Sequence, residues 1–78
     1  MKIVFLGRLV DVTGQSERAI DLPGEIDDVD GLRAWLGLEI PALLDPKIRL
    51  IVNDTLAQRG QHVSPVDEVA FFPPLSGG

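Results

Sequence analysis

The chain has 78 residues, of which 45% are hydrophobic and 24% charged, and its net charge is −5. This length is typical of one domain, and the hydrophobic fraction excludes a disordered chain. The acidic balance argues against nucleic-acid binding, because phosphate contacts need clustered lysines and arginines. Here no two of the seven basic residues are adjacent.

The chain contains no cysteine, which argues against a secreted protein. Small secreted domains usually depend on disulfides, which this chain cannot form. Its apolar N-terminal stretch is too short for a signal peptide, and no run approaches the roughly 20 apolar residues of a membrane span. We therefore expect a cytoplasmic protein without a membrane partner.

The N-terminal third has the composition of strands. Residues 2–10 are rich in β-branched and large apolar side chains, which predicts a strand covered on both faces. Turn-forming residues occupy 11–16, and imperfect alternation over 17–22 predicts a second strand that pairs with the first as a hairpin.

One helix is expected over residues 28–37. Asp27 and Asp28 stand where helix N-caps occur, and Gly37 is a plausible C-terminal stop. Four apolar residues follow the spacing of a single helical face, namely Val29, Leu32, Trp35 and Leu36. This pattern favours packing of the only tryptophan in the core over ligand stacking.

The remaining chain predicts an irregular segment followed by strands. Two prolines argue against any regular element over 40–47. Strands are predicted over 48–52 and 68–72. The polar segment 56–63 is ambiguous and could form a short strand at the edge of the sheet. The order strand, strand, helix, strand, strand predicts an α+β fold, a mixed sheet with one main helix packed on one face.

Residues for an internal active site are scarce. His62 is the only histidine and lies in a polar stretch, where an exposed histidine without a role is the better interpretation. The chain offers no set of ligands at zinc-site spacing, no partner base for its serines and no glycine-rich phosphate loop. We expect no enzyme activity from the chain alone and no bound metal or cofactor.

The C-terminal residues are the candidate site. Phe71 and Phe72 should point to opposite faces of their strand, so that one is buried and the other exposed. Pro73 and Pro74 then hold the chain extended, and residues 73–78 could reach about 20 Å from a domain of residues 1–72. A Gly77-Gly78 end can enter a channel too narrow for a β-carbon. A flexible functional tail is therefore favoured over a merely frayed end.

Residues 67–78, Asp-Glu-Val-Ala-Phe-Phe-Pro-Pro-Leu-Ser-Gly-Gly, resemble the closing motif of the ubiquitin-like sulfur carriers, specifically the small subunit of molybdopterin synthase. The segments 9–14, 32–36 and 52–53 are similar to that family's first hairpin, helix and third strand end. The resemblance implies a β-grasp fold.

It also implies the chemistry. In the family, an adenylating enzyme related to ubiquitin E1 uses ATP and Mg²⁺ to activate the terminal carboxylate, here that of Gly78. Sulfur then converts it to a thiocarboxylate, which the large synthase subunit, in a heterotetramer, uses to build the dithiolene of molybdopterin. The resemblance assigns the reactive end to Gly78 and Gly77, and partner contacts to Phe72, Pro73, Pro74, Leu75 and Ser76.

The sequence departs from the family pattern at several positions. Relatives often have glycine in place of Val66, so the turn here must avoid positive φ, with Pro65 leading a type I turn. Relatives often have arginine where this chain has Val10, although Arg8 is nearby. Two alternatives stay open: a thiamine-type or other ubiquitin-like sulfur carrier, and a non-conjugating β-grasp interaction module that uses its sheet face alone.

Overall fold

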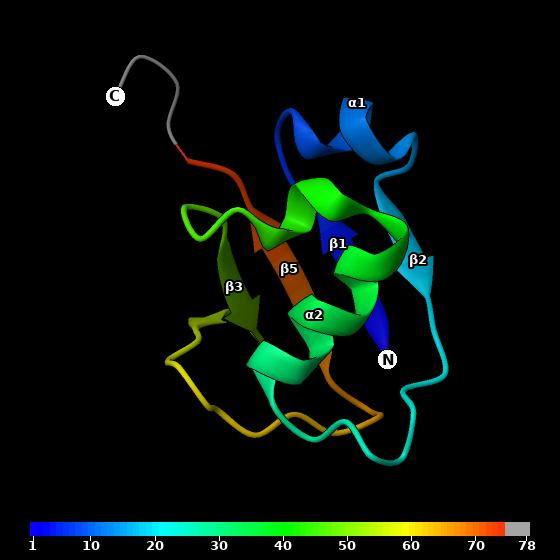
Figure 1. Cartoon of the computed structure of the whole chain (residues 1–78), viewed down its shortest axis with the longest axis vertical. Coiled ribbons are helices and arrows are strands. Elements are labelled where there is room, and N and C mark those ends of the chain that lie inside the picture. The colour runs from blue at the N-terminus through cyan, green and yellow to red at the C-terminus, as the bar shows by residue number, and fades with distance from the viewer. Residues whose placement is uncertain (75–78) are drawn as a thin grey trace.

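The computed structural model describes residues 1–74; the predicted site residues Leu75, Ser76, Gly77 and Gly78 lie outside this range. Within it, one sheet contains all of the strands, which are β1 (Lys2–Phe5), β2 (Glu17–Ala19), β3 (Arg49–Val52), β4 (Thr55–Leu56) and β5 (Glu68–Phe72). The helical elements are α1 (Leu9–Thr13), α2 (Val29–Glu39) and the 3₁₀ helix η1 (Pro41–Leu44) (Figure 1). Of these described helices, none is long and apolar enough to cross a membrane.

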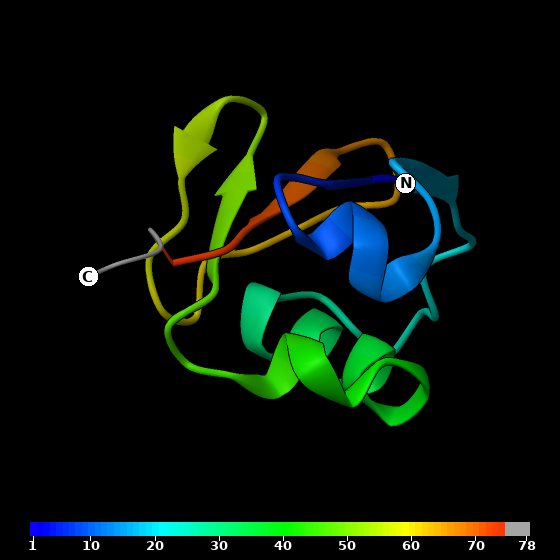
Figure 2. The ribbon, with the colours of Figure 1, turned by 90° about the horizontal axis from the view of Figure 1, so that it is seen from above.

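The sheet has the order β2-β1-β5-β3-β4. The central pair, β1 and β5, is parallel, whereas β1–β2, β5–β3 and β3–β4 are antiparallel. Helices α1, α2 and η1 all lie on the same side of this sheet (Figure 2). The predicted mixed sheet with its main helix on one face is therefore confirmed, as is the pairing of the first two strands.

The core lies between α2 and the central strands. Alternate residues of β1 and β5 face the helix, so that Ile3, Phe5, Val69 and Phe71 are at most 2% exposed. The rings of Phe5 and Phe71 stack with centroids 6.1 Å apart. Leu32 of α2 is fully buried in the same core cluster, and Trp35 packs, partly buried, against that cluster as its spacing predicted.

The prediction of a continuous strand over 2–10 is wrong. The strand ends at Phe5, and Gly7 adopts a φ of 55°, which starts a turn into α1. Leu9 then buries itself on the helix side of the sheet, and Thr13 Oγ1 donates to the Leu9 carbonyl at 2.8 Å. The backbone N–H of Gly14, in the left-handed conformation, closes the turn on the Val10 carbonyl. Local composition missed this helix because its residues also suit a strand.

Helix α2 begins as predicted and ends later than predicted. The Asp28 carboxylate accepts a hydrogen bond from the Gly31 N–H at 2.7 Å, which makes Asp28 the N-cap. Gly37 does not stop the helix. It is buried in the last turns, where a Cβ would clash with Leu44 Cδ2, so the small size of glycine lets η1 pack against the helix. The helix ends before Pro41, which disfavours helical geometry in the preceding residue.

The prolines of 40–47 also led to an error, since η1 is a regular element with Pro41 in its first turn. The edge strand predicted over 56–63 is mostly wrong: β4 does lie at the edge of the sheet, but it covers only Thr55–Leu56, and 57–63 form a loop with one isolated bridge at His62. Asn53 and Asp54 form the preceding turn with φ values of 48° and 68°. The last strand, β5, has the predicted bounds.

Replacement of the α2 N-cap tests which of the two aspartates starts the helix. Asp28→Ala should lower the free energy of unfolding by about 1 kcal/mol, because the Gly31 N–H loses its acceptor. Asp27→Ala removes the same charge from an exposed neighbour and should cost under about 0.5 kcal/mol. Urea denaturation measures both, and equal losses would contradict the assignment.

Candidate functional site

Strand β5 leads the chain to the predicted tail, and its last two residues point in opposite directions. Phe71 is fully buried on the helix side, whereas Phe72 is 38% exposed on the other face. Phe72 lies opposite Arg49 in the antiparallel β5–β3 pair. The sequence prediction of one buried and one surface phenylalanine is confirmed, with Phe72 as the surface member.

The sheet face without helices carries an apolar patch, which we call the outer patch. The pairing registers place Val4, Ala70, Ile51 and Leu56 in one row across four strands, next to Phe72. Leu56 is 53% exposed and the first three are half-buried. A hollow of about 330 Å³ lies between Arg49, Ile51, Leu56 and Phe72. Among the described residues this is where an apolar surface adjoins the chain exit.

The chain after Phe72 is partly held by the N-terminal segment. Pro73 and Pro74 are both half-buried. A Cβ added to Gly7 would lie 3.1 Å from Pro73 Cγ, so a glycine gives Pro73 its place beside the turn after β1. Gly7 was not among the site residues predicted from the sequence, and the signal that could have found it is a glycine that interrupts an otherwise strand-like run.

A tight turn fixes the start of β5. The Asp67 N–H donates to the Ser64 carbonyl at 3.1 Å across Pro65 and Val66. Val66 avoids positive φ, as its sequence required, and is 91% exposed. The Ser64 backbone N–H and the Asn53 side-chain amide both donate to the Asp67 carboxylate and lower its pKa.

The described residues contain no group of three or more side chains that could hold a metal ion. His62 is exposed, and only its backbone bridges to Asp28. The arrangement offers a folded domain with a buried core, an apolar sheet face and a chain that leaves the sheet beside that face. Such a surface can bind a partner protein and hold the chain that follows β5 next to that partner.

The chain belongs to the ThiS family, whose model matches residues 3–78. It is similar to the molybdopterin synthase sulfur carrier subunit of Escherichia coli, at 30% identity over 100% of this chain and 99% of that protein. Its identity to the protein of the same name from Caenorhabditis elegans is 34%, over 100% of this chain and 96% of that protein. These relationships place it among the ubiquitin-like sulfur carriers of the ThiS and molybdopterin synthase type.

Solved structures agree on the fold. The crystal structure of small archaeal modifier protein 1 from Haloferax volcanii superposes with a TM-score of 0.74 at 28% identity, covering 96% of this chain and 97% of that one. A putative molybdopterin converting factor, subunit 1, from Pyrococcus furiosus gives 0.77 at 19% identity, covering 95% of each chain. The predicted β-grasp fold is confirmed.

The two phenylalanines should differ sharply in their effect on stability. Phe71→Ala removes a fully buried ring and should lower the free energy of unfolding by about 3 to 5 kcal/mol. Phe72→Ala should cost about 1 kcal/mol or less, because the ring is partly in solvent. Urea denaturation provides the comparison, and Phe71→Leu keeps the measurement possible where the alanine variant unfolds. A larger loss at position 72 would overturn the assignment of faces.

Proposed function

We propose that this chain is the sulfur carrier subunit of a molybdopterin synthase, and that the carboxylate of Gly78 carries the sulfur. The observation that carries the proposal is the extent of the family match, which runs to Gly78. Curated relatives that bear the name of this subunit also align with the whole chain.

The chemistry requires activation of the chain end. A carboxylate resists nucleophilic attack until one oxygen is converted into a leaving group. An adenylating partner related to ubiquitin E1, using ATP and Mg²⁺, joins AMP to the Gly78 carboxylate and releases pyrophosphate. A hydrosulfide-level sulfur (HS⁻) then attacks the carbonyl carbon, the bond to AMP breaks, and loss of a proton leaves a thiocarboxylate. The carrier contributes binding and delivery, and the catalytic groups belong to its partners.

The outer patch and the chain exit together suit partner binding. Phe72 is exposed beside the half-buried Pro73 and Pro74, so a partner that covers the patch also receives the chain that follows. We assign this contact to the large synthase subunit, in a heterotetramer, and to the adenylating enzyme. Leu75, Ser76 and Gly77 complete the proposed contact, and the cytoplasm is the proposed compartment.

A second candidate is a ubiquitin-like modifier or another sulfur carrier of the family. It is favoured by the likeness to small archaeal modifier protein 1, at 28% identity and a TM-score of 0.74. Both candidates use the activated Gly78 carboxylate and differ in the acceptor, which is sulfur for the carrier and a protein amine for the modifier. A non-conjugating interaction module would not need Gly78 at all.

Deletion of Gly78 should abolish sulfur transfer and leave the midpoint of thermal unfolding unchanged, because the buried core residues that the structure describes all lie between Ile3 and Phe71. The assay combines the purified carrier, the adenylating enzyme, ATP, a sulfur donor, the large subunit and the pterin precursor that receives the sulfur, and mass spectrometry follows the carrier and the pterin product. Gly24→Ala is the control, since a Cβ there meets no atom within 4 Å. Sulfur transfer by the deletion variant would refute the proposal, and adducts on protein lysines without dithiolene formation would favour the modifier.

A further inference from the structure

The sheet face that carries the outer patch is charged differently at its two ends. At the end away from the chain exit, Lys2 Nζ lies 3.1 Å from Glu17 Oε2 and 3.5 Å from Glu68 Oε1. The pairing registers put these three side chains on the same face as the outer patch, because residues opposite each other in a sheet point to the same side. Each charge at this end therefore has a partner within the domain.

Arg49 stands at the other end of this face, beside the chain exit. It begins β3 and lies opposite Phe72, so its side chain belongs to the outer face as well. Arg49 is exposed, and the ion pairs within residues 1–74 are made by Lys2 and Arg18. No described carboxylate thus lies within 4.0 Å of its guanidinium.

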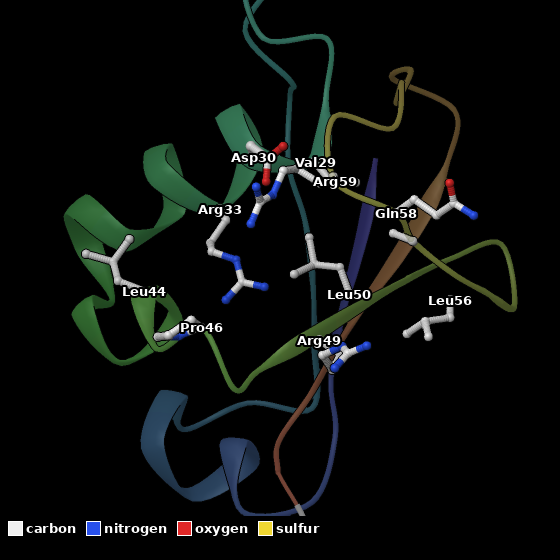
Figure 3. Close-up of a pocket in the computed structure, with 11 residues that line it drawn as sticks. Val29, Asp30, Arg33, Leu44, Pro46, Arg49, Leu50, Leu56, Gln58 and Arg59 are labelled. Carbon is white, nitrogen blue, oxygen red and sulfur yellow. The ribbon is translucent and has the colours of Figure 1, made fainter.

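Two other arginines are committed to the fold, which sets Arg49 apart. Arg18 donates to both carboxylate oxygens of Glu39, at 3.0 and 2.6 Å. Arg33 lies in the hollow on the helix side of β3 (Figure 3) and donates to three backbone carbonyls of the segment 43–48. Among the described residues Arg49 makes no comparable bond, so its guanidinium is available to a partner.

The hollow of the outer patch has opposite charges at its two ends. Its walls are Ile51, Leu56 and Phe72, and Arg49 and Asp54 complete the lining. Arg49 begins β3 whereas Asp54 follows its end, so the cation lies beside the chain exit and the carboxylate lies away from it. A protein surface complementary to this hollow has an apolar side chain in its centre and a carboxylate near the chain exit.

We propose that Arg49 is a recognition residue for the adenylating partner. Its guanidinium pairs with an aspartate or glutamate of that protein, next to an apolar side chain that fills the hollow. A guanidinium matches a carboxylate with two parallel hydrogen bonds, which fix orientation as well as adding affinity. Because Arg49 lies opposite Phe72, the residue before Pro73, this bond also sets the position of the partner relative to the chain that leads to Gly78.

The adenylating partner is the occupant because of what it must recognise. Every polypeptide ends in a carboxylate, so the enzyme that activates this one has to select it by its folded surface. The apolar part of the outer patch supplies area, and an unpaired arginine at its edge rejects surfaces that offer no carboxylate. The inference rests on the proposed function, since it names a determinant of the surface that the partner covers.

The test measures ATP–pyrophosphate exchange by the adenylating enzyme at increasing concentrations of the full-length carrier. Arg49→Gln should raise KM about tenfold, through the loss of one charge-assisted pair, and leave kcat and the midpoint of thermal unfolding unchanged. Arg59→Gln is the matched control, because Arg59 is exposed in the loop after β4 and lines the helix-side hollow. Asp54→Asn removes the opposite charge from the outer hollow and should leave KM unchanged or lower it.

Three results would overturn the role of Arg49. They are an unchanged KM in Arg49→Gln, a fall in kcat without a rise in KM, and an equal rise in KM in Arg59→Gln or Asp54→Asn. Any of them, with the unaltered protein still adenylated, leaves the proposed function of Gly78 standing. Absence of adenylation of the unaltered protein would instead refute that function, and the role of Arg49 with it.

Discussion

Parallel pairing of the first and last strands is the constraint on which the other features depend. Strands β1 and β5 lie side by side at the centre of the sheet, from Lys2 opposite Glu68 to Phe5 opposite Phe71. The Leu6 N–H continues the ladder by donating to the Phe71 carbonyl at 3.1 Å. Because the two strands run in the same direction, the turn after β1 and the chain after β5 emerge at the same end. Gly7 and Pro73 meet there.

Side chains along β5 point alternately into the core and onto the outer patch. Val69 and Phe71 belong to the core, while Ala70 and Phe72 belong to the outer patch. A shift of β5 by one residue would turn the core side chains outward and the patch side chains inward at the same time. Stability and partner binding are therefore assigned to neighbouring residues of one strand.

The sequence predicted the fold class and the last strand well, because the residues that begin or end these elements act locally and are recognisable in the sequence. Pro73 and Pro74 end β5, and Asp28 begins α2 with a side-chain cap, so both boundaries depend on nearby residues. Helix α1 was missed because Leu9 and its neighbours suit a strand equally well, and tertiary burial of Leu9 decides between them. Gly37 was misread as a stop because its role is to admit Leu44, a contact that no local pattern reveals.

The central claim is that sulfur is carried on the last carbonyl of the chain and is delivered by a folded domain that binds the partner. The most direct measurement is the intact mass of the protein purified from its own cells. The account predicts a fraction in which one oxygen of the terminal carboxylate is replaced by sulfur, located on Gly78 by fragmentation and lost when the adenylating partner is deleted. A carrier found only with an unmodified carboxylate while molybdopterin is being made, or with sulfur elsewhere in the chain, would contradict it.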